Sequence, residues 1–170
     1  MAGTDNRKKY RIRTYNRSSN MIRLEEKSKL RGMTRKMAQK ISFEDTARYL
    51  NCEASFDDNY LSAVLNTLML SKNMHPVCIV EYDRTAYIEE VGNVRITFDR
   101  DLRGSLYPEY FLDDTSDQMI PVLPNGIHVL EVKYDEFLPS YILQAIDINT
   151  LRKTSMSKYK IVRNVLDGKE

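Results

Sequence analysis

The sequence predicts an α+β fold built on an antiparallel β-sheet, with about six strands and three or four helices. Several stretches alternate charged with apolar residues at the period of a β-strand, turn sequences separate neighbouring strands, and two segments have the spacing of an amphipathic helix. The chain has 170 residues, of which 42% are hydrophobic, which is enough to form a core. We therefore expect a single domain over residues 1–170.

The first predicted strand is residues 9–16 (KYRIRTYN), where the two-residue period places Arg11 and Arg13 on one face. An arginine stays charged in a protein, and its planar fork of donors suits phosphate or carboxylate oxygens. Two arginines side by side therefore indicate an anion site. A solvated strand face is the alternative, because exposed arginine is common on half-buried strands.

Two more basic strands follow, at residues 21–29 and 34–41, and their charged residues include Glu25, Lys27, Lys36 and Lys40. Like charges stacked across neighbouring strands destabilise a sheet unless they are screened, paired or bound to an anion. The repeated pattern therefore indicates a site more than a surface. For Glu25 the sequence allows either a cross-strand salt bridge or a metal ligand.

The formal net charge of +2 conceals an asymmetry along the chain. Residues 1–42 hold 13 Lys and Arg against three acidic residues, a balance of +10, so the remainder carries −8. This split indicates an anionic partner for the first part. Nucleic acid is not expected, because the basic residues alternate along strands and the aromatic residues lack the spacing of RNA-recognition motifs. Because the sequence shows neither a secretion signal nor a long apolar run, we expect a cytoplasmic protein.

Two helices are predicted after the basic strands. Ser42 followed by Asp45 is an N-cap signature, which begins a helix that ends near Leu50. Residues 57–71 predict a second helix, whose apolar stripe consists of Leu61, Val64, Leu65 and Leu68. We expect this stripe to pack on the outside of a sheet.

The remaining elements are predicted as strands at residues 76–87, 94–99 and 128–137, a long loop at 104–127, and helices at 139–148 and 157–166. Alternation in residues 94–99 places Arg95, Thr97 and Asp99 on one face, opposite an apolar face. In the same way, Glu131 and Lys133 share a face of the last strand.

Two arrangements suit such strands: an ordinary sheet with one wet side, or a sheet curled so that its ionic faces line an interior and helices cover the outside. In the curled arrangement the cations Arg11, Arg13, Lys27, Arg84, Arg95 and Lys158 would converge. Their mutual repulsion would be severe, and only a polyanion could offset it. A triphosphate or polyphosphate chain fits, and Glu25 or Glu131 could then hold a divalent cation that bridges phosphate oxygens.

The segments RIRTYN, LEEK, EYDRTAY, VRITFD, VLEVKY and SKY occur in this order over about residues 9–160. This ordered set resembles the VTC domain, the catalytic domain of the vacuolar transporter chaperone polyphosphate polymerase and its bacterial relatives. The resemblance implies the triphosphate tunnel metalloenzyme (CYTH-like) fold, an antiparallel sheet curled into a complete or incomplete tunnel barrel with helices outside. It also implies transfer of the terminal phosphoryl group of a nucleoside triphosphate to a growing polyphosphate chain, with Mn²⁺ or Mg²⁺ as cofactor.

The resemblance assigns roles to individual residues. The phosphate-binding set is Arg11, Arg13, Lys27, Tyr82, Arg84, Arg95, Lys133 and Lys158, with Lys36 or Lys40 on the return strand. Within this set Arg84, Arg95 and Lys158 are expected to be catalytic. Glu131 is the implied metal ligand, and Glu25 is a second candidate.

Family members normally carry a further segment before the first basic strand, with another phosphate-contacting lysine, whereas this chain begins almost at that strand. Two alternatives to the polymerase therefore stay open: a triphosphate or polyphosphate hydrolase of the same fold, and a noncatalytic polyphosphate-binding module. The expected partners are a nucleoside triphosphate, inorganic polyphosphate and a membrane protein supplied in trans. Such a partner would place the chain at the inner face of a membrane.

Overall fold

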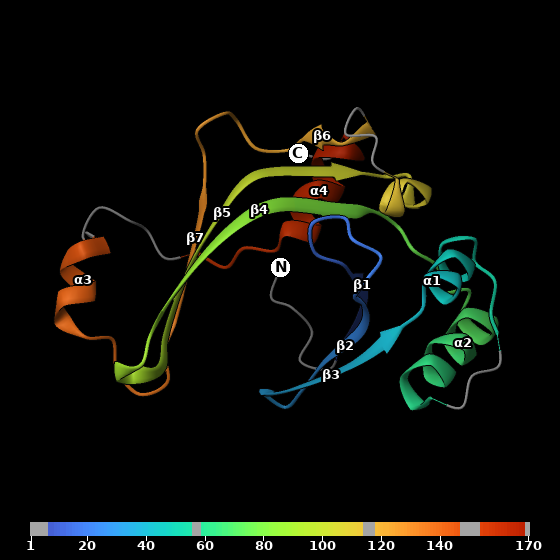
Figure 1. Ribbon diagram of the computed structural model, residues 1–170, viewed down its shortest axis with the longest axis horizontal. Helices are drawn as coiled ribbons and strands as arrows, with labels where there is room; N and C mark the ends of the chain where they lie inside the picture. The colour runs from blue at the N-terminus through green and yellow to red at the C-terminus, as the bar shows by residue number, and fades with distance from the viewer. Residues whose placement is uncertain (1–6, 56–58, 114–117, 147–153, 169–170) are drawn as a thin grey trace. The chain divides into compact units, whose positions relative to one another are not determined.

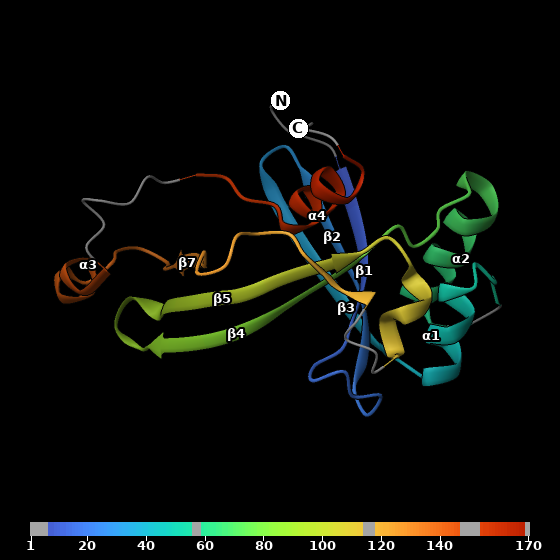
Figure 2. The same ribbon diagram turned by 90° about the horizontal axis from the view of Figure 1, so that it is seen from above.

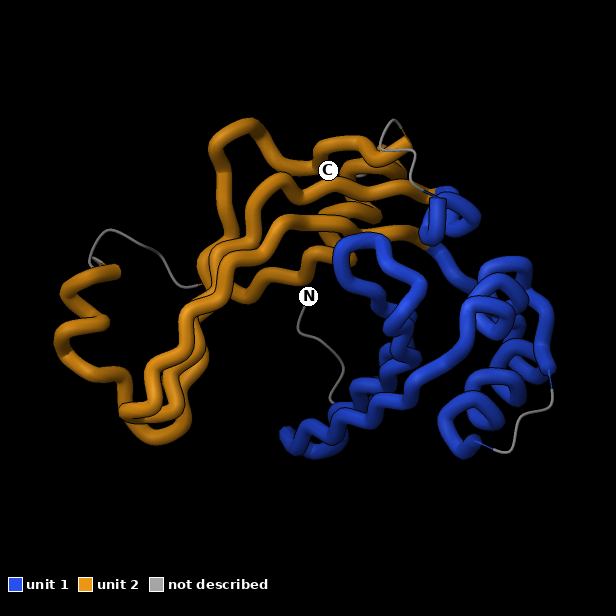
Figure 3. Tube along the Cα trace, in the orientation of Figure 1, with its two compact units in different colours: residues 1–77, 107–115 blue, residues 78–106, 116–170 orange. Residues whose placement is uncertain are grey.

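A computed structural model describes residues 7–55, 59–113, 118–146 and 154–168 of the chain. Two compact units are distinguished in Figure 3: unit 1 comprises residues 1–77 and 107–115, and unit 2 comprises residues 78–106 and 116–170. Each unit has its own antiparallel sheet (Figure 1). The predicted α+β class is confirmed, and no closed barrel is found among the described strands. The single domain over the whole chain stays a prediction.

The sheet of unit 1 consists of three strands in the order β1-β2-β3, with bounds Arg7–Arg13, Ile22–Leu30 and Met33–Ile41. All three predicted basic strands are therefore confirmed. The first ends earlier than predicted, because Asn16 and Arg17 both have a φ of 52°, which an extended strand does not allow.

Helices α1 (Phe43–Leu50) and α2 (Tyr60–Lys72) belong to the same unit and lie beside this sheet (Figure 1). Their apolar residues pack on one face of the sheet. The predicted cap is present: the Ser42 hydroxyl accepts a hydrogen bond from the Asp45 backbone at 2.9 Å, within a full capping box. The core comprises Ile22, Leu24, Ile41, Tyr49, Leu61 and Leu65. Residues 56–58, part of the predicted second helix and the residues before it, lie outside the described residues.

The sheet of unit 2 is organised around its central strand β5 (Val94–Ser105), which pairs with β4 (Ile79–Glu89), β6 (Ile120–Pro121) and β7 (Val129–Lys133). Figure 2 shows β4 and β5 as a long hairpin. Three predictions need correction. The strand predicted at residues 128–137 ends at Lys133, the last residue of β7 that pairs with β5. The strand predicted at residues 94–99 continues to Ser105, and the stretch at 104–127 holds a 3-10 helix (Pro108–Leu112) and β6 instead of a structureless loop. β6 is too short to show periodicity, and it forms only by pairing with the distant Arg103 and Gly104.

Two further helices belong to unit 2, α3 (Ser140–Ile146) and α4 (Lys158–Leu166). The last residues of the helix predicted at 139–148 lie outside the described residues. α4 packs on β5 at Gly104, where an added Cβ would lie 2.4 Å from a Val162 methyl carbon, so only glycine allows this approach. No helix in the described parts of the chain combines the length and apolar character needed to cross a bilayer.

Candidate functional site

An ionic cluster lies on one face of the unit 2 sheet. Strand pairing places Arg84 opposite Asp99, and it places Glu131 opposite Thr97, two residues before Asp99. Arg84 binds Asp99 in a bidentate pair, with Nε 2.6 Å from Oδ1 and Nη2 2.7 Å from Oδ2. Its Nη2 also lies 3.9 Å from a Glu131 oxygen. Arg84 therefore lies between two carboxylates.

The second cation of the cluster comes from the first residue of α4. Ser157 caps this helix by accepting a hydrogen bond from the Lys160 backbone, which fixes where α4 begins. The Lys158 Nζ atom lies 2.6 Å from Asp99 Oδ2. The guanidinium carbon of Arg84 and the ammonium of Lys158 each lie 5.1 Å from the centre of the Tyr82 ring. Tyr82 therefore contributes two cation–π contacts.

Asp99 is 1% exposed, yet it stays ionised. Burial acts to raise the pKa of Asp99, but hydrogen bonds from Arg84 and Lys158 outweigh burial and hold this pKa below its ordinary value. The hydrogen bond to Asp99 in turn raises the pKa of Arg84 against the effect of burial. Asp99 and Arg84 are therefore charged together at neutral pH.

Glu131 is more accessible, with 39% of its side chain exposed. Burial acts to raise the pKa of Glu131, but the hydrogen bond from Lys133, whose Nζ is 2.9 Å from Oε1, lowers it, and Lys158 and Arg84 add to the lowering. Glu131 is thus an ionised carboxylate at the accessible side of the cluster.

Arg95 lies farther along the same face. It is exposed, and strand pairing places it directly opposite Lys133. Among the described residues the Arg95 side chain makes no hydrogen bond or ion pair, and both cations line a shallow pocket with Asn93, Tyr134 and Asp135. The Asp135 carboxylate accepts a hydrogen bond from the Asn93 side chain at 2.8 Å, and the two cations leave the pocket with a net positive charge. Two like charges opposite each other destabilise a sheet, so this pocket favours an anion.

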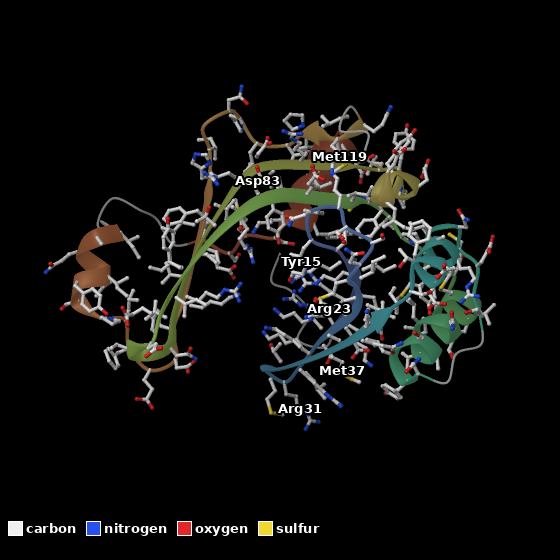
Figure 4. The ribbon with its side chains drawn as sticks, in the orientation of Figure 1. Tyr15, Arg23, Arg31, Met37, Asp83 and Met119 are labelled. Atoms are coloured by element: carbon white, nitrogen blue, oxygen red, sulfur yellow. The ribbon has the colours of Figure 1, made fainter. Side chains whose placement is uncertain are left out.

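Unit 1 carries a second, much larger cationic face, on the side of its sheet opposite the core. Its alternate residues include nine cations, Arg7, Lys9, Arg11, Arg13, Arg23, Lys27, Lys29, Lys36 and Lys40, against the single carboxylate of Glu25. Two rows of three cations run straight across the strands: Lys9, Lys27 and Lys36 form one, and Arg13, Arg23 and Lys40 form the other. Figure 4 labels Arg23, at the centre of the second row.

Glu25 lies between these rows, in ion pairs with Arg11 at 2.5 Å and Arg13 at 3.8 Å. This is the cross-strand salt bridge that the sequence allowed as an alternative to a metal ligand. The pairing also shows that Lys36 and Lys40 both lie on the cationic face. The sequence had left open which of the two binds phosphate, and both belong to the same surface.

The predicted site residues thus fall into two groups. Unit 2 brings together Tyr82, Arg84, Glu131, Lys133 and Lys158, with Arg95 farther along the same face, and unit 1 brings together Arg11, Arg13, Glu25, Lys27, Lys36 and Lys40. Sequence reasoning did not assign a site role to Asp99 or Arg23. Both lie on faces that alternation predicted to be charged. The even spacing of Asp99 from Arg95, and of Arg23 from Glu25, was the signal that could have identified them.

The carboxylates of the site fit a divalent cation only if phosphates of a substrate supply further ligands. In the described ranges no three His, Cys, Asp or Glu side chains form a group that could hold a metal. Mg²⁺ is commonly held by one or two carboxylates together with substrate phosphates. The ionised, accessible Glu131 is suited to that kind of binding, whereas Glu25 is already occupied by two arginines.

The unit 2 sheet carries cations bound to a buried aspartate, and the unit 1 sheet has a face of nine cations. These features define an α+β protein suited to binding a polyanion. A family model for the VTC domain matches residues 1–166, and the chain therefore belongs to the VTC domain family. Membership confirms the resemblance seen in the sequence and indicates a polyphosphate-related function. No curated protein and no solved structure matches the chain at a significant level.

Proposed function

We propose that the chain binds inorganic polyphosphate and transfers the terminal phosphoryl group of a nucleoside triphosphate to it. The observation that carries this proposal is the cluster of Arg84 and Lys158 around the buried Asp99, with the accessible Glu131 beside it. Two cations fixed on a buried carboxylate, with an accessible carboxylate next to them, suit a phosphate chain and its bound metal.

The two rows of cations on β1–β3 support the same ligand. Like charges placed directly across a sheet are unfavourable in the free protein, and a chain of phosphates would offset them along its length. The proposal includes the tunnel that the resemblance implies.

The chemistry demands little from nucleophilic side chains. Phosphoryl transfer depends mostly on alignment and on stabilising charge at the transferring group, which is what cations such as Arg84 and Lys158 provide. Glu131 would hold Mn²⁺ or Mg²⁺, which neutralises phosphate charge when bound. Arg95 and Lys133 extend the cationic face for the rest of the phosphate chain.

One assay tests the proposal and separates its alternatives. The purified chain is incubated with ATP and Mn²⁺ and scored for long-chain polyphosphate, free phosphate and bound polyphosphate. Polymer supports the polymerase, free phosphate alone indicates the hydrolase, and binding without turnover indicates the module. Failure to bind polyphosphate at all would refute every form of the proposal.

A matched pair of lysines on α4 provides the control. Lys158→Gln removes a cation of the cluster, whereas Lys160→Gln removes the same charge from an exposed position on the same helix. We expect only the first variant to lose activity and affinity. A cytoplasmic location and a membrane-protein partner stay predictions.

A further inference from the structure

Asp99 contacts both cations at the centre of the unit 2 cluster. We propose that Asp99 is a positioning residue: its carboxylate holds Arg84 and Lys158 in the arrangement that receives phosphate. This inference rests on the proposed function, and it adds a residue whose part in the site is indirect. Asp99 would not touch the phosphate chain, because its side chain is buried beneath the cations that do.

The burial of the three side chains supports this arrangement, in which Asp99 lies beneath the two cations. Asp99 has no exposed side-chain area, whereas Arg84 and Lys158 are 27% and 19% exposed. Asp99 lies on the central strand, with its backbone paired to Arg84 on one side and to Val129 on the other. The carboxylate therefore occupies the base of the cluster, and each cation keeps a surface that a ligand can reach.

The hydrogen bonds leave donors for that ligand. A guanidinium has five N–H groups, and the pair with Asp99 uses only the Nε hydrogen and one on Nη2. An ammonium has three, and the contact with Asp99 needs one. Both cations can therefore bind phosphate oxygens without leaving Asp99. Because long cationic side chains lose rotamer freedom when they bind, holding them in advance favours binding.

Charge alone predicts the opposite effect of removing Asp99. A carboxylate near a phosphate chain repels it, so replacing Asp99 with a neutral residue should strengthen binding if only net charge mattered. If positioning dominates, binding should weaken despite the gain of positive charge. The two explanations differ in sign, and the affinity of one variant decides between them.

The experiment measures the affinity of the full chain for inorganic triphosphate by calorimetry, using Asp99→Asn. The control is Asp83→Asn, which removes the same charge from an exposed aspartate on β4 (labelled in Figure 4) whose position in the strand places it on the opposite face from Arg84. We expect Asp99→Asn to bind at least about tenfold more weakly, and the control to bind like the wild type. Equal or tighter binding by Asp99→Asn overturns the inference, whereas a wild-type chain that does not bind triphosphate refutes the proposed function itself.

A second measurement on the wild type does not depend on the variant folding. In the free protein the Arg84 Nε–H group is already bonded to Asp99, so its NMR signal should exchange slowly with water before triphosphate is added. Arg31, exposed at the tip of the β2–β3 hairpin (Figure 4), is the reference for an exposed guanidinium. Exchange at Arg84 as fast as at Arg31 would overturn the inference. A merely structural aspartate would leave triphosphate affinity unchanged once the fold is intact.

Discussion

Replacing Arg23 with glutamine should make the free protein more stable while weakening its hold on polyphosphate. Arg23 lies at the centre of a row, directly opposite Arg13 on one neighbouring strand and Lys40 on the other. Within the described part of the chain, its side chain makes only a weak hydrogen bond to the Met21 sulfur at 3.5 Å. The substitution therefore removes two repulsive pairs and loses little.

The magnitude follows from Coulomb's law. Long side chains on opposite residues can spread their charged groups to about 8 Å, where two unit charges in water repel by about 0.5 kcal/mol. Two such pairs give about 1 kcal/mol at low salt, in the range of measured cross-strand effects. For a chain of this size that corresponds to a rise in Tm of about 2–4 °C.

Urea unfolding at low ionic strength and at about 1 M salt measures this effect, since a Debye length of about 3 Å removes most of the repulsion. The matched control is Arg35→Gln on β3, which removes the same charge from the other face, opposite Ser28. Only Arg23→Gln should be stabilised at low salt, and its gain should fade at high salt. If it is destabilised, or if both variants shift equally, the reasoning from stacked cations is wrong.

Three other predictions concern the cluster of unit 2. Arg84→Ala and Arg95→Ala should each reduce phosphoryl transfer at least about a hundredfold; only Arg84→Ala should also lower the free energy of unfolding, by about 3 kcal/mol, because it leaves Asp99 short of a partner. Glu131→Gln should abolish the response of activity to added Mn²⁺ while polyphosphate binding persists, and a Mn²⁺ titration checks this. The pKa of Asp99 is lower in the folded protein than its ordinary value of 3.8. The stabilising effect of its charge is therefore complete above pH 3.8 and is lost as the pH falls through the pKa of the folded state. The difference in stability between wild type and Asp99→Asn should accordingly shrink in acid.

Local signals in the sequence were sufficient for most elements of the fold. The hydroxyl group of Ser42 begins a helix where its capping pattern indicates, and alternation located the three basic strands. Elements that depend on distant partners were missed. β6 and the second half of β5 show no alternation of apolar and charged residues in the sequence. They form strands because they pair with each other and with β4.

The candidate site was predicted less completely. Alternation places residues on a face but does not say which strands are neighbours, so Lys36 and Lys40 could not be separated and Arg23 was not singled out. Asp99 was identified as part of a charged face, where an aspartate ordinarily faces water. Its burial under Arg84 and Lys158 depends on α4, which follows it by more than fifty residues in the sequence.

The bare backbone at Gly104 determines how far Lys158 reaches. Val162 lies one helical turn after Lys158 on α4, so both residues point toward the sheet, and the valine rests where Gly104 has only hydrogen. A single methyl group there would push the helix outward and draw the ammonium away from its aspartate. A Gly104→Ala chain would then bind phosphate more weakly although every charged residue is retained. The absence of a side chain at Gly104 thus sets the distance between Lys158 and Asp99.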